Sequence, residues 1–232
     1  MEIRIEEKIL PFAMAEEIKN LRTSITFSGD DIKTILFTSS TANEGKSTIT
    51  IETVKSFAEL GKKALLIDCD LRKSILKNKI KSGSIRKGLT HFLTGQCDFE
   101  DIIYECKSEA DDNEFYVIPA GPTSKNPTEL LASEKFKSMI KELRDEYDVI
   151  VIDTPPLNEV IDASIVSKNV DGSIIVVEAG NVNYKVIQKT RDKLLLAGAK
   201  ILGVVLNKVD KSKNSYGYYK YGKSYGYYYG NN

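Results

Sequence analysis

Short apolar runs alternate with helical patterns from about residue 33 to residue 210. Six runs rich in Ile and Val have the sequences KTILFTSS, KALLIDCD, FYVIPAG, YDVIVIDTPP, GSIIVVEAG and KILGVVLNKVD. Continuous apolar runs of this length are typical of buried parallel strands. Between them, apolar residues at helical spacing predict helices; two end at Gly61 and Gly198, and one begins near Pro127. The alternation predicts an α/β fold, a three-layer sandwich around a mostly parallel central sheet.

Two segments fall outside this alternation and divide the chain into three parts. Residues 1–30 form an N-terminal extension with an amphipathic helix from about Met14 to Phe27, ahead of the first strand. Residues 31–210 form the α/β domain. Residues 211–232 contain only Tyr, Gly, Lys, Ser and Asn. Because this composition offers no aliphatic side chain to bury, we expect a disordered, flexible tail.

The composition favours a cytoplasmic globular protein. Of the 232 residues 41% are hydrophobic, and the formal net charge of zero gives no overall field toward nucleic acid or an anionic membrane. Cys69, Cys97 and Cys106 lack CxxC spacing, as expected of reduced thiols. The N-terminus lacks the apolar core of a signal peptide. No apolar run approaches the roughly 20 residues of a membrane-spanning helix, so we expect any membrane attachment to come through a partner.

A phosphate-binding loop follows the first apolar run. The residues of this loop are Asn43, Glu44, Gly45, Lys46, Ser47 and Thr48. They match the end of the pattern G-x-x-x-x-G-K-[ST], although Ser40 replaces its first glycine. Backbone N–H groups at the start of the next helix would face the phosphates, Lys46 would reach the β- and γ-phosphates, and Ser47 would bind Mg²⁺. The alternative, an accidental GKS that opens an ordinary helix, is less compatible with the strand–loop–helix context.

Aspartates end two further apolar runs. Asp68 and Asp70 end the second run, and Asp153 ends the fourth in the form of a Walker B strand. If the second strand continues to residue 70, both of its carboxylates point the same way, because side chains alternate along a strand. One carboxylate at a strand end often only caps the next helix. Three carboxylates beside a phosphate loop are suited to Mg²⁺ binding and to general-base catalysis at a triphosphate.

These motifs together resemble those of the bacterial tyrosine kinases, relatives of the MinD-type ATPases. The resemblance rests on the phosphate loop, LLIDCDLR, VIVIDTPP and a terminal tyrosine cluster, and NLRTSITF and AGPTSKNPTELLAS agree with it. It extends from about Glu16 through the tail. It implies an ATP- and Mg²⁺-dependent protein-tyrosine kinase that autophosphorylates and regulates capsular or extracellular polysaccharide synthesis or export.

The resemblance implies a role for each motif residue. Lys46 and Ser47 would bind phosphate and Mg²⁺, and Asp68 would be the base for the tyrosine hydroxyl. Asp70 and Asp153 would support Mg²⁺, so that Lys46, Asp68 and Asp70 form the expected catalytic set. The family loop usually reads Pro-Gly-Glu-Gly-Lys, and this chain departs from it with Ala-Asn-Glu-Gly-Lys. Asn is among the few other residues that tolerate the left-handed backbone a glycine adopts there.

Two further residues bear on nucleotide recognition. Arg72 would contact phosphate or substrate. Residues 207–210 match the guanine-binding pattern NKxD, but in MinD-type ATPases an Asn after this strand contacts adenine, which would be Asn207. We favour ATP over GTP.

The tyrosine tail is the expected substrate. The predicted phosphoacceptors are Tyr216, Tyr218, Tyr219, Tyr221, Tyr225, Tyr227, Tyr228 and Tyr229. A short tail beside its own active site would struggle to fold back onto it, so we expect transfer between subunits. The competing hypotheses are a MinD- or ParA-type nucleotide-switch ATPase, and a tyrosine-rich module that binds single-stranded nucleic acid or polysaccharide. The third leaves the Walker strands unexplained. His91, the one histidine, has no partner suggested by spacing.

The N-terminal helix is the expected site of self-association. Glu16, Lys19 and Arg22 share one helix face. Charges alone favour a solvated face, but the resembled family carries an E-x-x-R-x-x-R motif here that joins subunits into a ring, with octamers among the closed forms. The resemblance also implies a separate transmembrane activator, a cognate phosphotyrosine phosphatase and substrates such as sugar-nucleotide enzymes, with no nucleic acid. It implies a cytoplasmic location at the inner face of the cell membrane.

Overall fold

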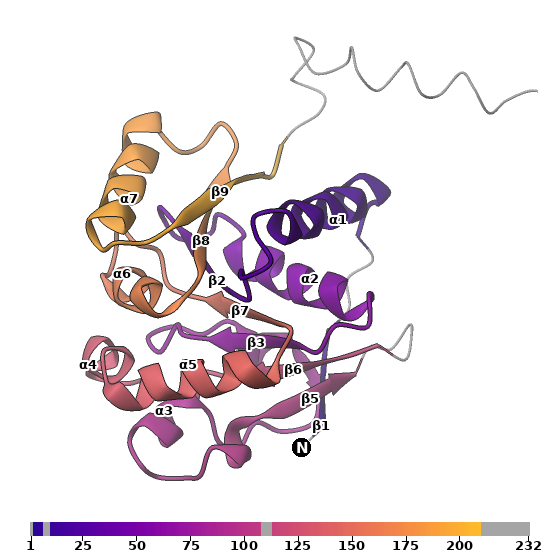
Figure 1. The fold of residues 1–232 in the computed structure, drawn as a ribbon, viewed down its shortest axis with the longest axis vertical. Helices are drawn as coiled ribbons and strands as arrows, with labels where there is room; N and C mark the ends of the chain where they lie inside the picture. The colour runs from indigo at the N-terminus through magenta and orange to yellow at the C-terminus, as the bar shows by residue number, and fades with distance from the viewer. Residues whose placement is uncertain (1, 7–9, 108–112, 210–232) are drawn as a thin grey trace, which may run out of the picture.

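The computed structural model describes residues 2–6, 10–107 and 113–209. Within them, nine strands form one sheet in the order β4-β1-β5-β6-β3-β7-β2-β8-β9 (Figure 1). The strands are β1 (Glu2–Ile5), β2 (Thr34–Ser39), β3 (Ala64–Asp68), β4 (Ile80–Ser82), β5 (Tyr104–Lys107), β6 (Glu114–Ile118), β7 (Val149–Asp153), β8 (Gly172–Glu178) and β9 (Ile201–Asn207). The predicted tail, residues 211–232, lies outside the described residues.

The helices cover both faces of this sheet. They are α1 (Phe12–Thr26), α2 (Lys46–Ala58), α3 (Leu89–Leu93), α4 (Pro127–Leu131), α5 (Glu134–Glu146), α6 (Asp162–Val166) and α7 (Tyr184–Leu196), with 3₁₀ turns at Leu76–Lys79, Glu100–Ile102 and Ser167–Asn169. Figure 1 shows α1 and α2 together on one side of the sheet, with α5, α6 and α7 on the other. None of the described helices has the length and apolar character needed to cross a membrane.

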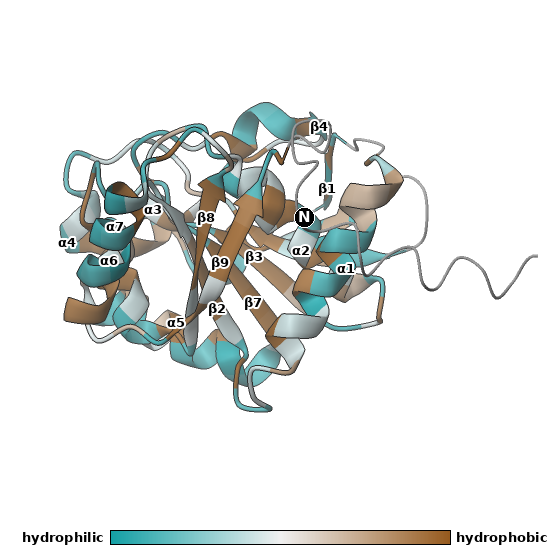
Figure 2. Ribbon diagram, turned by 90° about the horizontal axis from the view of Figure 1, so that it is seen from above, coloured by the Kyte–Doolittle hydropathy of each residue, from teal (hydrophilic) through white to brown (hydrophobic). Residues whose placement is uncertain are grey.

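The six apolar runs form β2, β3, β6, β7, β8 and β9, and each pair of neighbours among them is parallel, which confirms the predicted fold class. Their side chains alternate between two apolar layers. In β2, Leu36 packs with the layer under α5 and α6, whereas Ile35 and Phe37 pack with the layer under α1 and α2. Burial on both faces explains why these strands are continuous apolar runs. Figure 2 shows this apolar character on the central strands.

The edge strand β9 departs from the prediction that all six runs are buried. Val204 is 55% exposed and Leu206 is 58% exposed. β9 pairs with β8 on one side only, because it ends the sheet. A position at the edge therefore leaves part of an apolar strand accessible.

Glycines and a serine set the helix ends. Gly61 and Gly198 follow α2 and α7 with φ angles of 70° and 83°, a left-handed conformation that ends helices as the sequence predicts. The single helical pattern that begins near Pro127 forms two helices, α4 and α5. The chain is extended at Ser133, whose hydroxyl accepts a hydrogen bond from the N–H of Phe136 at 3.2 Å. This N-cap restarts the helix.

The N-terminal extension was only partly predicted. α1 forms at the expected place, but β1 precedes it and joins the sheet between β4 and β5. Ile3 and Ile5 of β1 are buried. β4 runs antiparallel to β1, and β5 antiparallel to β6. The predicted helix is confirmed, but the expectation that it precedes the first strand is wrong, because β1 comes before it. The strands β1, β4 and β5 are too short and too polar to stand out in a chain dominated by longer runs.

Asp171 joins three elements at the amino end of the sheet. Its Oδ2 accepts hydrogen bonds from the N–H groups of Lys33 and Thr34 at 2.9 Å and 2.8 Å, and from the Thr34 hydroxyl at 2.9 Å. The Arg144 guanidinium, from α5, lies 3.2 Å away. Burial alone would raise the pKa of Asp171, but the hydrogen bonds from Thr34 and Lys33 outweigh it and lower the pKa.

Replacing Asp171 with Asn should lower the free energy of unfolding at pH 7 by about 1.5–3 kcal/mol, the range for hydrogen bonds to a charged group. Urea denaturation measures this change. Because the folded pKa lies below the unfolded value, the contribution is present above about pH 4 and is lost as pH falls through the folded pKa. The two proteins should therefore converge in acid.

Asp192→Asn is the matched control, because the ion pair that Asp192 forms within the described part of the chain is with its exposed neighbour Arg191. It should change the unfolding free energy by less than about 0.5 kcal/mol. Equal losses in both variants would contradict a special role for Asp171.

Candidate active site

A cavity of about 510 Å³ opens at the carboxyl edge of the sheet. Parallel strands present their carboxyl ends on the same edge, so loops far apart in sequence meet there. The cavity is lined by residues 42–48 of the predicted phosphate loop, together with Asp70, Arg72 and Lys208. A second cavity, of about 440 Å³, lies mainly between α6 and α7 and includes none of the predicted site residues. We therefore place the candidate site at the first cavity.

The loop backbone takes the left-handed turns that its sequence suggested. Gly45, at the start of α2, has a φ of 86°, and a Cβ atom there would lie 2.1 Å from Nδ2 of Asn207. Only glycine fits this position. Asn43 has a φ of 65°, the left-handed conformation that Asn tolerates better than most residues other than glycine. The departure in sequence preserves the backbone turn.

Side chains from other elements brace the loop. The Glu44 carboxylate is buried and accepts hydrogen bonds from the N–H and hydroxyl of Thr41, and from the Glu178 N–H at 3.1 Å. Ser40, which replaces the first glycine of the pattern, accepts a hydrogen bond from the Thr190 hydroxyl of α7 at 2.8 Å. Glu44 thus lines the cavity, while its carboxylate stabilises the loop through these hydrogen bonds. Motif matching alone did not reveal these braces.

Lys46 connects the cavity to the Walker B strand. Its side chain is largely buried, and Nζ forms an ion pair with Asp153 and lies 3.3 Å from the Ser47 hydroxyl. The structure therefore brings together the three residues that two separate motifs supplied.

Asp68 and Asp153 lie side by side at the ends of β3 and β7. They are 2% and 6% exposed and do not themselves line the cavity. Burial, and next the Asp153 charge, raise the pKa of Asp68 to about 7, against hydrogen bonds from Ser74 and the Asp70 N–H. Asp68 is therefore a carboxylate held away from solvent beside a second carboxylate. Ser74 was missed by sequence reasoning, because no motif marks it.

Asp70 does not share a strand face with Asp68. β3 ends at Asp68, so the expected alternation does not extend to residue 70. The Asp70 N–H donates to Asp68 Oδ1 at 3.0 Å. Its carboxylate accepts from the N–H groups of Arg72 and Lys73 at 3.2 Å and 2.9 Å. Asp70 thus shapes a turn at the rim of the cavity.

Arg72 is held by an unexpected partner. Its guanidinium donates to both oxygens of Asp162, at 2.8 Å and 3.2 Å, and to the Thr128 hydroxyl at 3.0 Å. The Asp162 hydrogen bond raises the pKa of Arg72. Arg72 still lines the cavity, with its charge oriented by α6 and α4.

The end of β9 reaches the same loop. Asn207 Nδ2 donates to the Glu44 carbonyl at 2.9 Å, and Lys208 Nζ donates to the Asn43 carbonyl at 2.7 Å. The predicted adenine contact of Asn207 stays a prediction, and Asp210 of the NKxD pattern lies outside the described residues.

The three residues of α1 predicted to mediate self-association, Glu16, Lys19 and Arg22, divide into two groups. Glu16 and Lys19 form an exposed pair at 2.8 Å. Arg22 is directed at α2, where it donates to the Ser56 carbonyl at 2.7 Å and to the Ser56 hydroxyl at 2.9 Å. Of these three residues, only Arg22 contacts another element among the described residues. The self-association surface stays a prediction.

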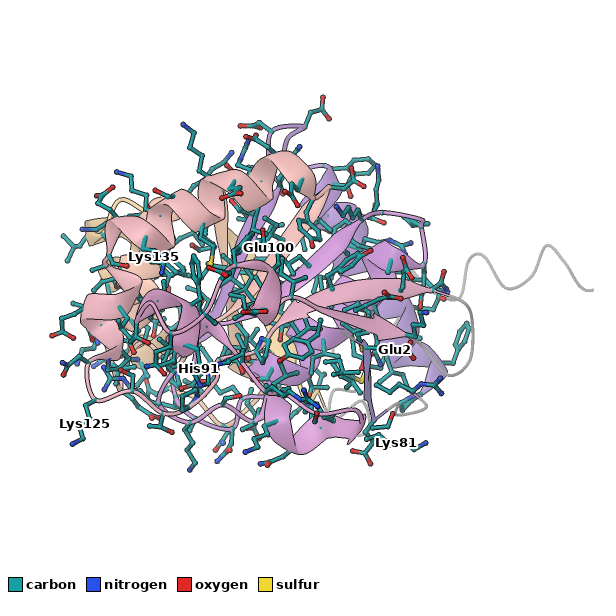
Figure 3. All side chains as sticks on the ribbon, turned by 90° about the horizontal axis from the view of Figure 1, so that it is seen from below. Glu2, Lys81, His91, Glu100, Lys125 and Lys135 are labelled. Atoms are coloured by element: carbon teal, nitrogen blue, oxygen red, sulfur yellow. The ribbon has the colours of Figure 1, made fainter. Side chains whose placement is uncertain are left out.

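His91 has a local structural contact. It belongs to α3 (Figure 3), and its Nδ1 accepts a hydrogen bond from the Gly88 N–H at 3.2 Å. Burial, and next the charge of Lys87, lower its pKa.

Comparison with known proteins gives three similarities. Residues 32–200 match the family described as AAA domain. The tyrosine-protein kinase CpsD of Streptococcus pneumoniae serotype 4 is 43% identical over 217 residues, which cover 93% of this chain and 94% of CpsD. The kinase domain of the Escherichia coli tyrosine kinase ETK has a TM-score of 0.76 at 28% identity, with 92% of this chain and 87% of that one covered.

The wider fold is shared with cell-division ATPases. MinD of Pyrococcus horikoshii, solved in complex with Mg-ADP, has a TM-score of 0.63 at 25% identity and covers 78% of this chain and 72% of its own. The similarity to CpsD is higher and extends over nearly the whole of both chains. The chain therefore belongs to the family of bacterial tyrosine-protein kinases.

Proposed function

We propose that this chain is an ATP-dependent protein-tyrosine kinase that phosphorylates the tyrosine cluster of a neighbouring copy. The observation that carries the proposal is the convergence of Lys46, Asp68 and Asp153 beside a cavity lined by the phosphate loop. The loop suits a polyphosphate, and the two carboxylates suit the acid–base and charge requirements of phosphoryl transfer. The kinship with CpsD and ETK supports the choice of tyrosine as acceptor.

The transfer needs one rearrangement of the residues described. Lys46 pairs with Asp153, and Asp68 is buried. In our proposal the β- and γ-phosphates of ATP draw Lys46 away from Asp153, which gives an incoming tyrosine access to Asp68. The tyrosine oxygen attacks the γ-phosphorus, its proton passes to Asp68, and ADP leaves. The raised pKa of Asp68 suits a base that works near neutral pH.

Residues that line the cavity, together with the neighbouring Asp153, fit Mg²⁺. The Ser47 hydroxyl and the carboxylates of Asp153 and Asp70 are oxygen ligands of the kind that Mg²⁺ takes. Among the described residues, no group of three or more His, Cys, Asp or Glu could hold a metal, and Mg²⁺ usually needs only one or two carboxylates plus substrate phosphates. When bound, Mg²⁺ would neutralise charge on the phosphate oxygens. The related MinD, solved with Mg-ADP, supports this assignment.

The origin of the tail supports its role as substrate. β9 ends at Asn207, and Lys208 lines the cavity, so the sequence leads into the tail from a residue of the cavity. A segment that starts so close to its own site has little chain with which to turn back into it. A neighbouring copy in a ring would present its tail at greater reach. We infer that the acceptors are the eight tyrosines of the cluster and that transfer occurs between subunits.

The resemblance stated above supports a biological setting. We propose that the kinase regulates capsular or extracellular polysaccharide synthesis or export at the inner face of the membrane. There it would bind a transmembrane activator, be reversed by a phosphotyrosine phosphatase and modify enzymes such as those of sugar-nucleotide metabolism. A nucleotide-switch ATPase is the second candidate, because the MinD fold is close. Phosphotyrosine after incubation with Mg-ATP separates the two, since a switch ATPase forms none.

Transfer between chains predicts the result of a mixing experiment. A Lys46→Met chain with an intact tail is incubated with Mg-ATP and an active chain truncated after Val209. Mass spectrometry should find phosphate on the tail of the Lys46→Met chain, because the truncated partner supplies the active site. The Lys46→Met chain alone should remain unmodified, and Lys200→Met, at an exposed lysine before β9, should behave as the native protein. An unmodified Lys46→Met tail in the mixture would exclude transfer between chains.

Self-association through α1 predicts a change in mass. The unphosphorylated native chain should form an oligomer in light scattering at high concentration, and Glu16→Lys should shift it to monomer, because the exposed Glu16 would then repel basic partners. Glu142→Lys, an exposed glutamate on α5, is the matched control and should leave the mass unchanged. Monomer alone for the native chain would contradict the ring, as would an oligomer unaffected by Glu16→Lys.

A further inference from the structure

Two consecutive carbonyl groups of the phosphate loop are held by the end of β9. The Asn43 carbonyl accepts a hydrogen bond from Lys208 Nζ at 2.7 Å, and the Glu44 carbonyl accepts one from Asn207 Nδ2 at 2.9 Å. Both donors come from neighbouring residues at the carboxyl end of the edge strand. The phosphate loop is therefore fixed from one side by residues about 160 positions away, as the sequence separations of 165 and 163 show.

These contacts orient the N–H groups of the loop. Within a trans peptide unit, the C=O and N–H bonds point in opposite directions, and no described peptide bond is cis. With the Asn43 carbonyl turned to Lys208, the Glu44 N–H points away from β9. The Gly45 N–H does the same, because the Glu44 carbonyl is turned to Asn207. Among the described residues, neither N–H has an acceptor.

Successive backbone N–H groups that point the same way form an anion-binding concavity. A carbonyl oxygen on that side would repel a phosphate. By holding both carbonyls on the β9 side, Lys208 and Asn207 leave the donors of the loop for an anion. This matters more here than in a loop with two glycines, because Asn43 must adopt a φ of 65° that few non-glycine residues favour.

Lys208 is itself held in place. Its φ is 56°, an uncommon backbone conformation for lysine. Its Nζ lies 2.9 Å from Oε2 of Glu178, at the end of β8, and this hydrogen bond lowers the pKa of Glu178. The Glu178 N–H in turn donates to the Glu44 carboxylate at 3.1 Å. The chain of contacts runs from Lys208 through Glu178 to Glu44 and returns to Lys208 through the Asn43 carbonyl.

We propose that Lys208 is a positioning residue that fixes the phosphate loop in its anion-binding conformation. The inference rests on the proposed function, in that the cavity receives nucleotide phosphates. It assigns Lys208 to the loop backbone rather than to the base. In the guanine-recognition pattern the same residue belongs to a base-binding motif, so the two assignments differ in the part of the nucleotide that Lys208 affects.

Titration calorimetry with the full chain tests this assignment. Lys208→Met keeps the length of the side chain but removes its charge and donors. The affinity for ADP and for inorganic pyrophosphate should fall about ten-fold, the effect of losing one charge-assisted hydrogen bond. The affinity for adenosine should not change. The KM for Mg-ATP should rise with little change in kcat. Lys208→Arg should recover most of the ADP affinity, and Lys200→Met, at the other end of β9, should match the native chain.

The outcomes separate this inference from the proposed function. Unchanged ADP affinity in Lys208→Met, with native ADP binding intact, overturns the positioning role alone. An equal loss for adenosine overturns it as well, because Lys208 would then act on the base. A native chain that binds neither ADP nor ATP overturns the proposed function. If Lys208→Met fails to fold by circular dichroism, Glu178→Gln provides the second test. This change removes the carboxylate partner of Lys208, so the affinity for ADP should fall by a smaller factor than in Lys208→Met. An unchanged affinity for ADP would contradict the proposal.

Discussion

A buried ammonium beside buried carboxylates is the interaction on which the rest of the structure depends. Lys46 pairs with Asp153, and Asp153 adjoins Asp68 across two neighbouring strands. Removing such charges from water costs several kcal/mol per ion unless their partners are well placed. The parallel sheet supplies that placement, because it aligns the ends of β2, β3 and β7 at one edge. Burial, and next the Asp153 charge, raise the pKa of Asp68.

The phosphate loop has Ser40 and Asn43 where the usual patterns have glycine, and side chains from other elements brace it. Ser40 bonds to α7, Glu44 to β8, and Asn43 to the lysine that follows β9. Each brace comes from an element later in the chain. The loop is thus shaped by the packed sheet as much as by its own residues, and the segment that leads into the tyrosine cluster takes part in holding it. The last described residues before the proposed substrate segment thus contact the proposed phosphate site.

Much of the fold and of the candidate site could be predicted from the sequence, because strong local signals coincide with function. Continuous apolar runs mark buried parallel strands, and the loop and the aspartates lie at their ends. The strands β1, β4 and β5 were missed because short, polar or isolated segments carry little periodicity. The break between α4 and α5 was missed because Ser133 also fits within a helical pattern, and only its hydrogen bond to Phe136 shows the cap.

The sequence by itself determined the α/β class, the six parallel strands and the convergence of the phosphate loop with Asp68 and Asp153, since each follows from patterns within about ten residues and from the shared edge of parallel strands. The partners of individual polar side chains were decided only by the tertiary structure. Arg72 pairs with Asp162, Arg22 with Ser56, and Lys208 with a loop carbonyl. These contacts join segments from 34 to 165 residues apart. Patterns within a short stretch of sequence cannot predict these contacts, because only the packing of the helices against the sheet brings the paired groups together.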